Sequence, residues 1–194
     1  MVMSKLNIQR SKAAFIFLLP IVVLLVSTAI FFIGLSPDGR TNNGVLIDPP
    51  IDLKSLDLKL GTGPLNKEYP GKWSVLHFVI NDCPEGCWDS LYKARQVHIR
   101  LSKDGNRLVR YLIKTENVSF EEIDLDKLKE EYPRLYMGNI DSKDLPEELL
   151  KLDSEGAYIL FDPLGNGFML YEKSLPGGEL LEDLKKLLKN SKIG

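Results

Sequence analysis

The chain has 194 residues, of which 44% are hydrophobic and 27% are charged, and its formal net charge at pH 7 is −2. This slightly acidic composition excludes a nucleic-acid-binding protein, which needs a basic surface. Its two cysteines close no long loop, and a domain of this size buries an adequate core without disulfides.

The first predicted element is an apolar helix. Residues 13–35 contain no ionisable side chain. A helix of about 20 residues spans the hydrocarbon core of a bilayer, and only a helix satisfies the backbone of a single apolar run in lipid. We therefore predict a cytoplasmic N-terminus at residues 1–12 and a transmembrane helix at residues 13–35. The competing interpretation is a cleaved signal peptide, which has a shorter apolar region and a small-x-small cleavage site that this run lacks.

The charges that flank this run predict its orientation. Lys5, Arg10 and Lys12 precede it, whereas Asp38 and Arg40 follow it and cancel. Because basic flanks stay in the cytoplasm, the remainder of the chain should lie outside it. We predict a single-pass protein of the bacterial inner membrane with a periplasmic C-terminal domain. Without the three basic residues, that outer part holds 22 basic and 27 acidic residues, which again argues against a nucleic-acid partner.

The next segments predict a linker and then one folded domain. Residues 36–69 are rich in proline, glycine and asparagine, which is typical of a linker or edge segment. Periodicity in residues 70–194 predicts strands at 73–80, 107–113, 157–161 and 167–171, and helices at 83–101, 124–135 and 178–190. This order is that of a thioredoxin-like fold. The predicted fold class is α/β, with a thioredoxin-like domain preceded by one N-terminal transmembrane helix.

Cys83 and Cys87 lie where the first predicted strand meets the first predicted helix. If Cys83 caps that helix, Pro84 occupies the first helical position, where the fixed φ of proline fits. Cys87 is then one turn further on the same face, so the two sulfur atoms can form a disulfide or share one metal ion. The positive end of the helix favours a thiolate at Cys83, whereas Glu85 and Asp82 oppose it. The motif predicts thiol chemistry, and the alternative is a small structural disulfide or two inert thiols.

Several segments resemble the Sco/SenC family of membrane-anchored thioredoxin-fold proteins. They are Gly71-Lys72-Trp73, the strand at 74–80, the Cys83–Cys87 motif and the turn Asp162-Pro163-Leu164-Gly165. Residues 43–50, together with Arg95-Gln96-Val97-His98 and Lys103-Asp104, resemble a divergent Sco-like group found alongside bacterial cytochrome oxidase assembly factors. The resemblance implies a role in assembling the copper centre of cytochrome c oxidase, with oxidase subunits or assembly factors as partners.

The resemblance also implies copper ligands. Sco proteins use two cysteines, matched by Cys83 and Cys87, and a histidine upstream of the Asp-Pro-x-Gly turn, where this chain has Ser154. The copper role is therefore implied only in part, although two thiolates alone hold the soft ion Cu(I). We expect the other histidines to lie too far away. His77 is about 20 Å from Cys83 along an extended strand, and His98 is about 16 Å from Cys87 along a helix.

Two expectations concern these histidines. His77 lies in an apolar strand, where a packed and hydrogen-bonded core residue is expected. For His98 we expect an exposed position on the helix near Arg95.

From these observations we predict a membrane-tethered, thioredoxin-like accessory factor in respiratory cytochrome oxidase biogenesis. It would act by thiol–disulfide exchange, as an oxidoreductase, or by Cu(I) handling, in both cases at Cys83 and Cys87. Its predicted partners are the lipid bilayer and oxidase subunits or assembly factors, and copper is the cofactor that the resemblance implies. The alternative is a non-catalytic interaction or scaffold module in which the two cysteines form a structural disulfide.

Overall fold

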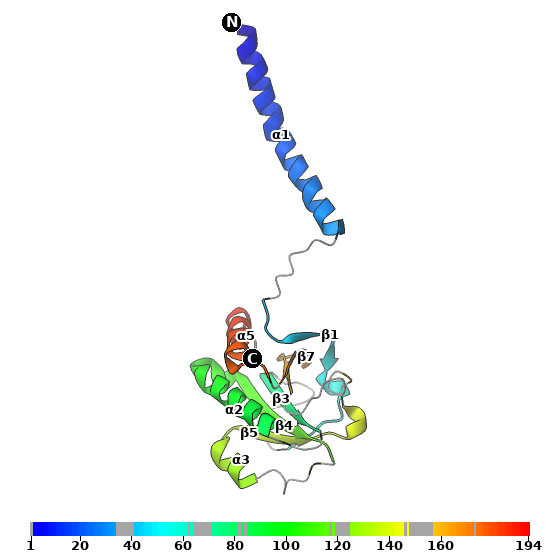
Figure 1. Cartoon of the computed structure of the whole chain (residues 1–194), viewed down its shortest axis with the longest axis vertical. Coiled ribbons are helices and arrows are strands. Elements are labelled where there is room, and N and C mark those ends of the chain that lie inside the picture. Colours follow the sequence, from blue (N-terminus) through cyan, green and yellow to red (C-terminus); the bar gives the residue numbers. More distant parts are fainter. Residues whose placement is uncertain are drawn as a thin grey trace. The chain divides into compact units, whose positions relative to one another are not determined.

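The computed structural model of the chain describes residues 2–33, 41–61, 63, 71–80, 83, 85–116, 118, 125–145, 147, 157–172 and 174–194, apart from the side chains of residues 2–14 and 125–127. The chain divides into two compact units, Met1–Thr41 and Asn42–Gly194 (Figure 1).

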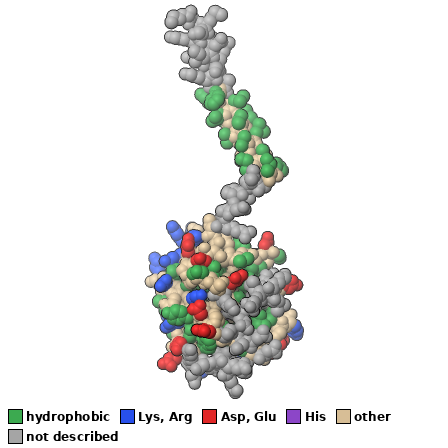
Figure 2. Space-filling view, viewed as in Figure 1, with side chains coloured by type: hydrophobic (Ala, Val, Ile, Leu, Met, Phe, Trp, Pro, Cys, Tyr) green, Lys and Arg blue, Asp and Glu red, His purple; other side chains and the backbone are tan. Residues whose placement is uncertain are grey.

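The first unit is the helix α1, Val2–Ile33. Its segment Phe15–Ile33 is long and apolar enough to cross a membrane, and none of it is buried against other parts of the chain. Hydrophobic side chains surround this segment (Figure 2). The hydroxyl of Thr28 donates to the carbonyl oxygen of Leu24 at 2.7 Å, so this polar group is satisfied within the helix. The predicted N-terminal apolar helix is thus confirmed.

The second unit is built on a seven-stranded mixed sheet in the order β1-β7-β6-β3-β4-β5-β2. The central strands β3, β4 and β5 are parallel, whereas the remaining pairs are antiparallel. Every residue of β3 is buried, as expected for a strand covered on both faces. The strands are β1 (Val45–Asp52), β2 (Lys59–Leu60), β3 (Trp73–Val79), β4 (Leu108–Lys114), β5 (Leu135–Asn139), β6 (Tyr158–Phe161) and β7 (Asn166–Tyr171).

Helices α2 and α5 cover one face of this sheet (Figure 1). Successive strand residues point to opposite faces. Accordingly, Val75 of β3 packs in a core layer with Leu184 of α5, while Leu76 packs in the opposite layer with Leu53. The helices are α2 (Glu85–Arg100), α3 (Leu125–Glu131) and α5 (Gly177–Asn190), and the 3-10 turns are η1 (Leu53–Ser55), η2 (Ser102–Arg107) and η3 (Ser142–Asp144).

The hairpin predicted after residue 157 is present, since β6 and β7 pair in antiparallel register. Its turn is held by Asp162, whose Oδ1 accepts hydrogen bonds from the backbone N–H groups of Leu164 at 2.8 Å and Asn166 at 2.9 Å. Gly165 has a φ of 97°, a left-handed conformation that glycine adopts without strain. The Asp-Pro-Leu-Gly sequence therefore sets the reversal between the two strands.

The helix predicted at 124–135 is wrong at its C-terminal end. Helix α3 ends at Glu131, and Leu135 instead begins β5, which pairs in parallel with β4. Pro133 explains the break, because proline lacks a backbone N–H and clashes with the preceding turn of a helix. Arg134 then has a φ of 70°, which reverses the chain into the strand.

The segment predicted as a linker or edge segment contains two strands. Within residues 45–60, β1 and β2 form the two edges of the sheet.

A buried carboxylate joins the start of the second unit to its last helix. Asp183 of α5 is 2% exposed. Its Oδ2 accepts hydrogen bonds from the backbone N–H groups of Asn43 at 2.9 Å and Gly44 at 3.1 Å, and from the Tyr171 hydroxyl at 3.1 Å. Its Oδ1 accepts from Nδ2 of Asn43 at 3.1 Å. Burial and the neighbouring Asp183 raise the pKa of the Tyr171 phenol.

Candidate functional site

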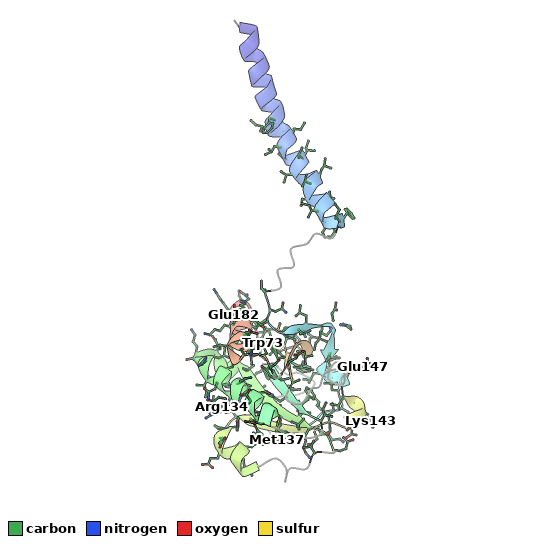
Figure 3. The ribbon with its side chains drawn as sticks, in the orientation of Figure 1. Trp73, Arg134, Met137, Lys143, Glu147 and Glu182 are labelled. Carbon is green, nitrogen blue, oxygen red and sulfur yellow. A yellow bond between two sulfur atoms is a disulfide. The ribbon has the colours of Figure 1, made fainter. Side chains whose placement is uncertain are left out.

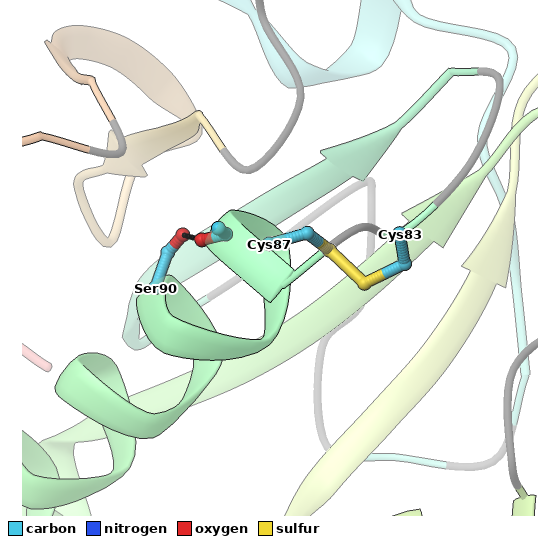
Figure 4. Close-up of a disulfide and its surroundings, with 4 residues drawn as sticks. Cys83, Cys87 and Ser90 are labelled. Carbon is cyan, nitrogen blue, oxygen red and sulfur yellow. Dashed lines mark hydrogen bonds between the residues drawn. A yellow bond between two sulfur atoms is a disulfide. The ribbon is translucent and has the colours of Figure 1, made fainter.

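The two cysteines are joined in a disulfide at the start of α2 (Figure 4). Strand β3 ends at Val79 and α2 begins at Glu85, so Cys83 precedes the helix and Cys87 lies in its first turn. Their Cα atoms are 5.1 Å apart. The structure thus brings together the two residues that the sequence selected, at the strand–helix junction where they were expected.

This disulfide lies at the edge of an apolar cluster. Cys83 is 7% exposed, whereas Cys87 is 1% exposed. Trp88 packs against the cluster, and its ring centroid is 6.3 Å from that of Tyr132, a buried member. Access from solvent therefore differs between the two sulfur-bearing residues, and Cys83 is the more accessible. The buried members that surround the pair are Val79, Leu91, Leu112, Val118, Leu128 and Tyr132.

The helix start gives the site a positive electrostatic bias. The first N–H groups of a helix lack intrahelical acceptors, and the helix dipole places partial positive charge there. Cys87 lies in this turn, where the carboxylate of Glu85 offsets part of that charge. Ser90 donates from its hydroxyl to the carbonyl oxygen of Gly86 at 3.2 Å, which ties down the same turn (Figure 4). Asp82 and Pro84, which the sequence analysis also invoked, lie outside the described residues.

His77 is a core residue, as expected. It lies on β3, is 2% exposed, and its ring centroid is 4.7 Å from that of Tyr158. Burial, followed by the charge of Arg110, lowers its pKa to about 3, so the ring is neutral at pH 7. The expected hydrogen bond is not found, because neither ring nitrogen has a partner among the described residues.

The prediction for His98 is wrong in one respect. The residue is half-buried rather than exposed, and both of its ring nitrogens are inaccessible and unpartnered within the described part of the chain. Burial, then Arg110 and Arg134, lower its pKa to about 4. His98 lies in the last turn of α2, so it is about 16 Å along the helix from Cys87. It is therefore not part of the thiol site.

The position implied for a third copper ligand, Ser154, lies outside the described residues. A different residue was missed by the sequence analysis. Arg110 lies in the middle of β4 and is 2% exposed. The signal was present, since Arg110 interrupts the run of apolar and aromatic residues at 108–113, and a buried charge normally requires a partner.

Comparison with known proteins agrees with this architecture. The copper-bound crystal structure of yeast Sco1 matches with 18% identity and a TM-score of 0.53, covering 79% of this chain and 96% of that one. The solution structure of apo Sco1 from Thermus thermophilus matches with 16% identity and a TM-score of 0.51, covering 78% and 99%. At this identity the likeness concerns the fold, and it confirms the Sco-like, thioredoxin-like architecture predicted from the sequence.

Sequence comparison leads to the same fold. No curated protein matches the sequence of this chain significantly. The family described as "Transmembrane-like, thioredoxin-like, C-terminal domain" matches residues 73–191, which is more than half of the chain and includes both cysteines. The chain therefore belongs to this transmembrane-like, thioredoxin-like family.

Proposed function

We propose that this protein is a membrane-tethered thiol–disulfide exchange factor that acts through Cys83 and Cys87 in the biogenesis of a respiratory cytochrome oxidase. One observation carries the proposal: the two cysteines are already bonded to each other at the N-terminus of α2. Reactive thiols concentrate at helix N-termini, because the positive end of the helix stabilises the thiolate.

The difference in exposure assigns a role to each sulfur. In exchange with a reduced partner, a partner thiolate attacks Sγ of Cys83, which is the more exposed of the two. The bond between the two Sγ atoms breaks, and Cys87 leaves as a thiolate that takes up a proton. A second partner thiolate then resolves the mixed disulfide and releases Cys83. The partner loses two electrons and this chain gains them, and the reverse sequence oxidises this chain.

Copper is the proposed cargo of the reduced state. Once the disulfide is reduced, two thiolates within one helical turn offer the soft donors that Cu(I) prefers. Neither histidine of the chain contributes a ligand in this proposal. His98 lies at the far end of α2, and the His77 ring is packed against Tyr158 in the core.

The proposed location follows from α1. Its apolar segment Phe15–Ile33 would cross the bacterial inner membrane once, with the basic N-terminus in the cytoplasm. The thiol site would then lie in the periplasm, a compartment in which disulfides form and persist. The proposed partners are oxidase subunits or their assembly factors, and the Sco-like fold supports this choice.

The alternative, a scaffold with a permanent structural disulfide, is favoured by a specific observation. Both cysteines are at least nine-tenths buried in the oxidised state, and Cys87 is almost fully buried. Buried cysteines are typically inert. An exchange factor requires that another thiol can reach Sγ of Cys83, whereas a scaffold with a structural disulfide does not.

Single cysteine variants test this difference. In full-length Cys87→Ser, the free Cys83 should form a mixed disulfide with oxidised glutathione, because no second thiol resolves it. In full-length Cys83→Ser, the more buried Cys87 should react at least about tenfold more slowly, because reactivity follows accessibility. Intact-mass spectrometry measures both rates, and the double variant is the control. Equal rates in the native state, or no adduct in either variant, would contradict the proposal.

The same double variant tests the copper cargo. Cu(I) binding by the reduced full-length chain, measured by competition with a colorimetric Cu(I) chelator, should be lost when both cysteines are serine. Binding that persists in the double variant would place the metal elsewhere and remove copper from the proposal.

A further inference from the structure

Two cavities lie at the C-terminal end of α2 and share His98 and Arg134. The one with a volume of about 240 Å³ is lined by the charged side chains of Arg95, Arg110 and Arg134, together with His98 and Ser102. We refer to it as the arginine cavity. Arg134 lies between α2 and α3 in Figure 3. The arginine cavity is distinct from the thiol site, which lies at the opposite end of α2.

Arg110 is the central feature of the arginine cavity. Arg110 lies in β4 and is 2% exposed, and its Nη2 donates to the carbonyl oxygen of Pro133 at 3.3 Å. Its Nε and other guanidinium nitrogen have no hydrogen-bond partner among the described residues. An unpartnered buried donor on a charged group is costly, and such a group requires an explanation, an unseen ion being one.

The charges around Arg110 are of the same sign. Burial, then Arg95 and Arg134, lower its pKa to about 10, and only Tyr132 opposes them. Burial, then Arg110 and Arg134, likewise lower the pKa of His98. None of the described residues that line the cavity is acidic. Positive charge is therefore concentrated at this cavity, and no described residue of its lining supplies a carboxylate to balance it.

The backbone at this cavity is also unusual. Ser102 has a φ of 54° and Arg134 a φ of 70°, and these are the two non-glycine residues with positive φ in the described part of the chain. Both line the arginine cavity. Non-glycine residues in this conformation cost free energy and cluster at ligand sites. The unusual backbone conformations of Ser102 and Arg134 therefore occur at the cavity that Arg95, Arg110 and Arg134 line.

We propose that the arginine cavity binds a phosphate group, carried either by a small soluble molecule or by a lipid headgroup. The planar guanidinium fork matches phosphate oxygens in pairs, and charge-assisted bonds of this kind are about twice as strong as neutral ones. A phosphate dianion balances more of the positive charge of three arginines than a single carboxylate does. The more accessible guanidinium groups of Arg95 and Arg134 would then donate to phosphate oxygens, and the buried charge of Arg110 in the same lining would add to the attraction.

Thermal unfolding of the full-length protein in an uncharged detergent tests the proposal. Inorganic phosphate is titrated at constant ionic strength against chloride, with tryptophan fluorescence as the readout. Tm should rise saturably with phosphate, since a ligand that binds only the folded state stabilises it. The variants Arg95→Gln and Arg134→Gln should each raise the apparent Kd at least about tenfold. Arg100→Gln is the matched control, because Arg100 is exposed on the same helix and lines neither cavity.

A second arm separates the two sources of the phosphate group. The full-length protein is placed in nanodiscs of phosphatidylcholine with or without phosphatidic acid. Stabilisation by phosphatidic acid but not by inorganic phosphate, lost in Arg95→Gln and Arg134→Gln, identifies a lipid headgroup. Stabilisation by inorganic phosphate with the same dependence identifies a soluble ligand. If Tm responds to neither, or responds equally in wild type, Arg134→Gln and Arg100→Gln, the proposal is overturned.

Discussion

Three polar residues on the central strands are buried without full hydrogen bonding: Ser74, His77 and Arg110. The protein carries the histidine as a neutral ring, because burial and the nearby Arg110 lower its pKa to about 3. An unfolded chain would restore the ordinary pKa of about 6.5. The difference between the two states makes the free energy of unfolding depend on pH.

The sign of that dependence follows from the two pKa values of His77. Above pH 6.5 neither state protonates the ring, so its contribution to stability is full. Between pH 6.5 and about 3, the unfolded state binds a proton that the folded state does not, so stability falls as the pH falls. The slope is at most about 1.4 kcal/mol per pH unit.

We expect His77→Phe to remove this part of the pH dependence, since phenylalanine does not titrate and can pack against Tyr158. The measurement is the free energy of unfolding of the full-length protein at pH 7 and pH 5, for wild type and variant in the same buffers. The carboxylates titrate equally in both proteins and cancel in the comparison. An unchanged difference between the two pH values would contradict the assigned protonation state of His77.

At the scale of elements, Asp183 couples the segment before β1 to α5. Four hydrogen bonds converge on its carboxylate, from Asn43, Gly44 and Tyr171. Because all four groups donate, both carboxylate oxygens of Asp183 must act as acceptors. It also explains why Asn43 and Gly44, which precede an edge strand, are fixed against the last helix of the domain.

Replacing Asp183 by asparagine should destabilise the folded state by about 1.5–3 kcal/mol, because an NH2 group then faces N–H donors. Thermal unfolding of the full-length protein measures the loss. Glu182→Gln is the matched control on the neighbouring position (Figure 3). Glu182 is exposed and pairs with Lys186 at 2.9 Å, and such surface pairs contribute little to stability because solvent screens them. Equal losses in the two variants would show that the buried network is not specific.

Several elements were predictable because their patterns are local. The apolar run of β3, the leucine stripe of α5 and the Asp-Pro-Leu-Gly turn each follow from neighbouring residues. Strand β5 was not, because Leu135 continues the apparent spacing of α3 across Pro133. The edge strands β1 and β2 lie within residues 36–69, which were predicted as a linker or edge segment. Their partners, β7 and β5, were not predictable, because they are more than 70 residues away.

The thiol site was predictable because its two cysteines are close in sequence, as in the other local patterns. Cys83 and Cys87 are four residues apart, so their proximity at the start of α2 was predictable, whereas the choice between a disulfide, a shared metal ion and two inert thiols was not. The arginine cavity was not predictable, because it combines α2, β4 and the turn after α3. Arg110 was visible as a charge in an apolar strand, but its neighbours Arg95 and Arg134 reach it only through the fold.

The molecule as a whole consists of α1, whose segment Phe15–Ile33 is long and apolar enough to cross a membrane, and a thioredoxin-like domain that carries one disulfide. An N-terminal apolar helix is compatible with a scaffold as well as with an exchange factor, so α1 does not distinguish the two functions. The central claim is therefore that the Cys83–Cys87 bond is exchangeable. A structural disulfide resists reduction by the glutathione pool, whereas an exchanging one does not.

The reduction potential of the full-length protein in detergent tests this claim most directly. The protein is equilibrated with a series of defined dithiol–disulfide redox buffers, and the fraction of the Cys83–Cys87 bond that is reduced is quantified by thiol alkylation and mass. We predict a potential above about −300 mV, in the range of exchanging pairs. A potential below about −300 mV would contradict the account and identify the bond as a structural one.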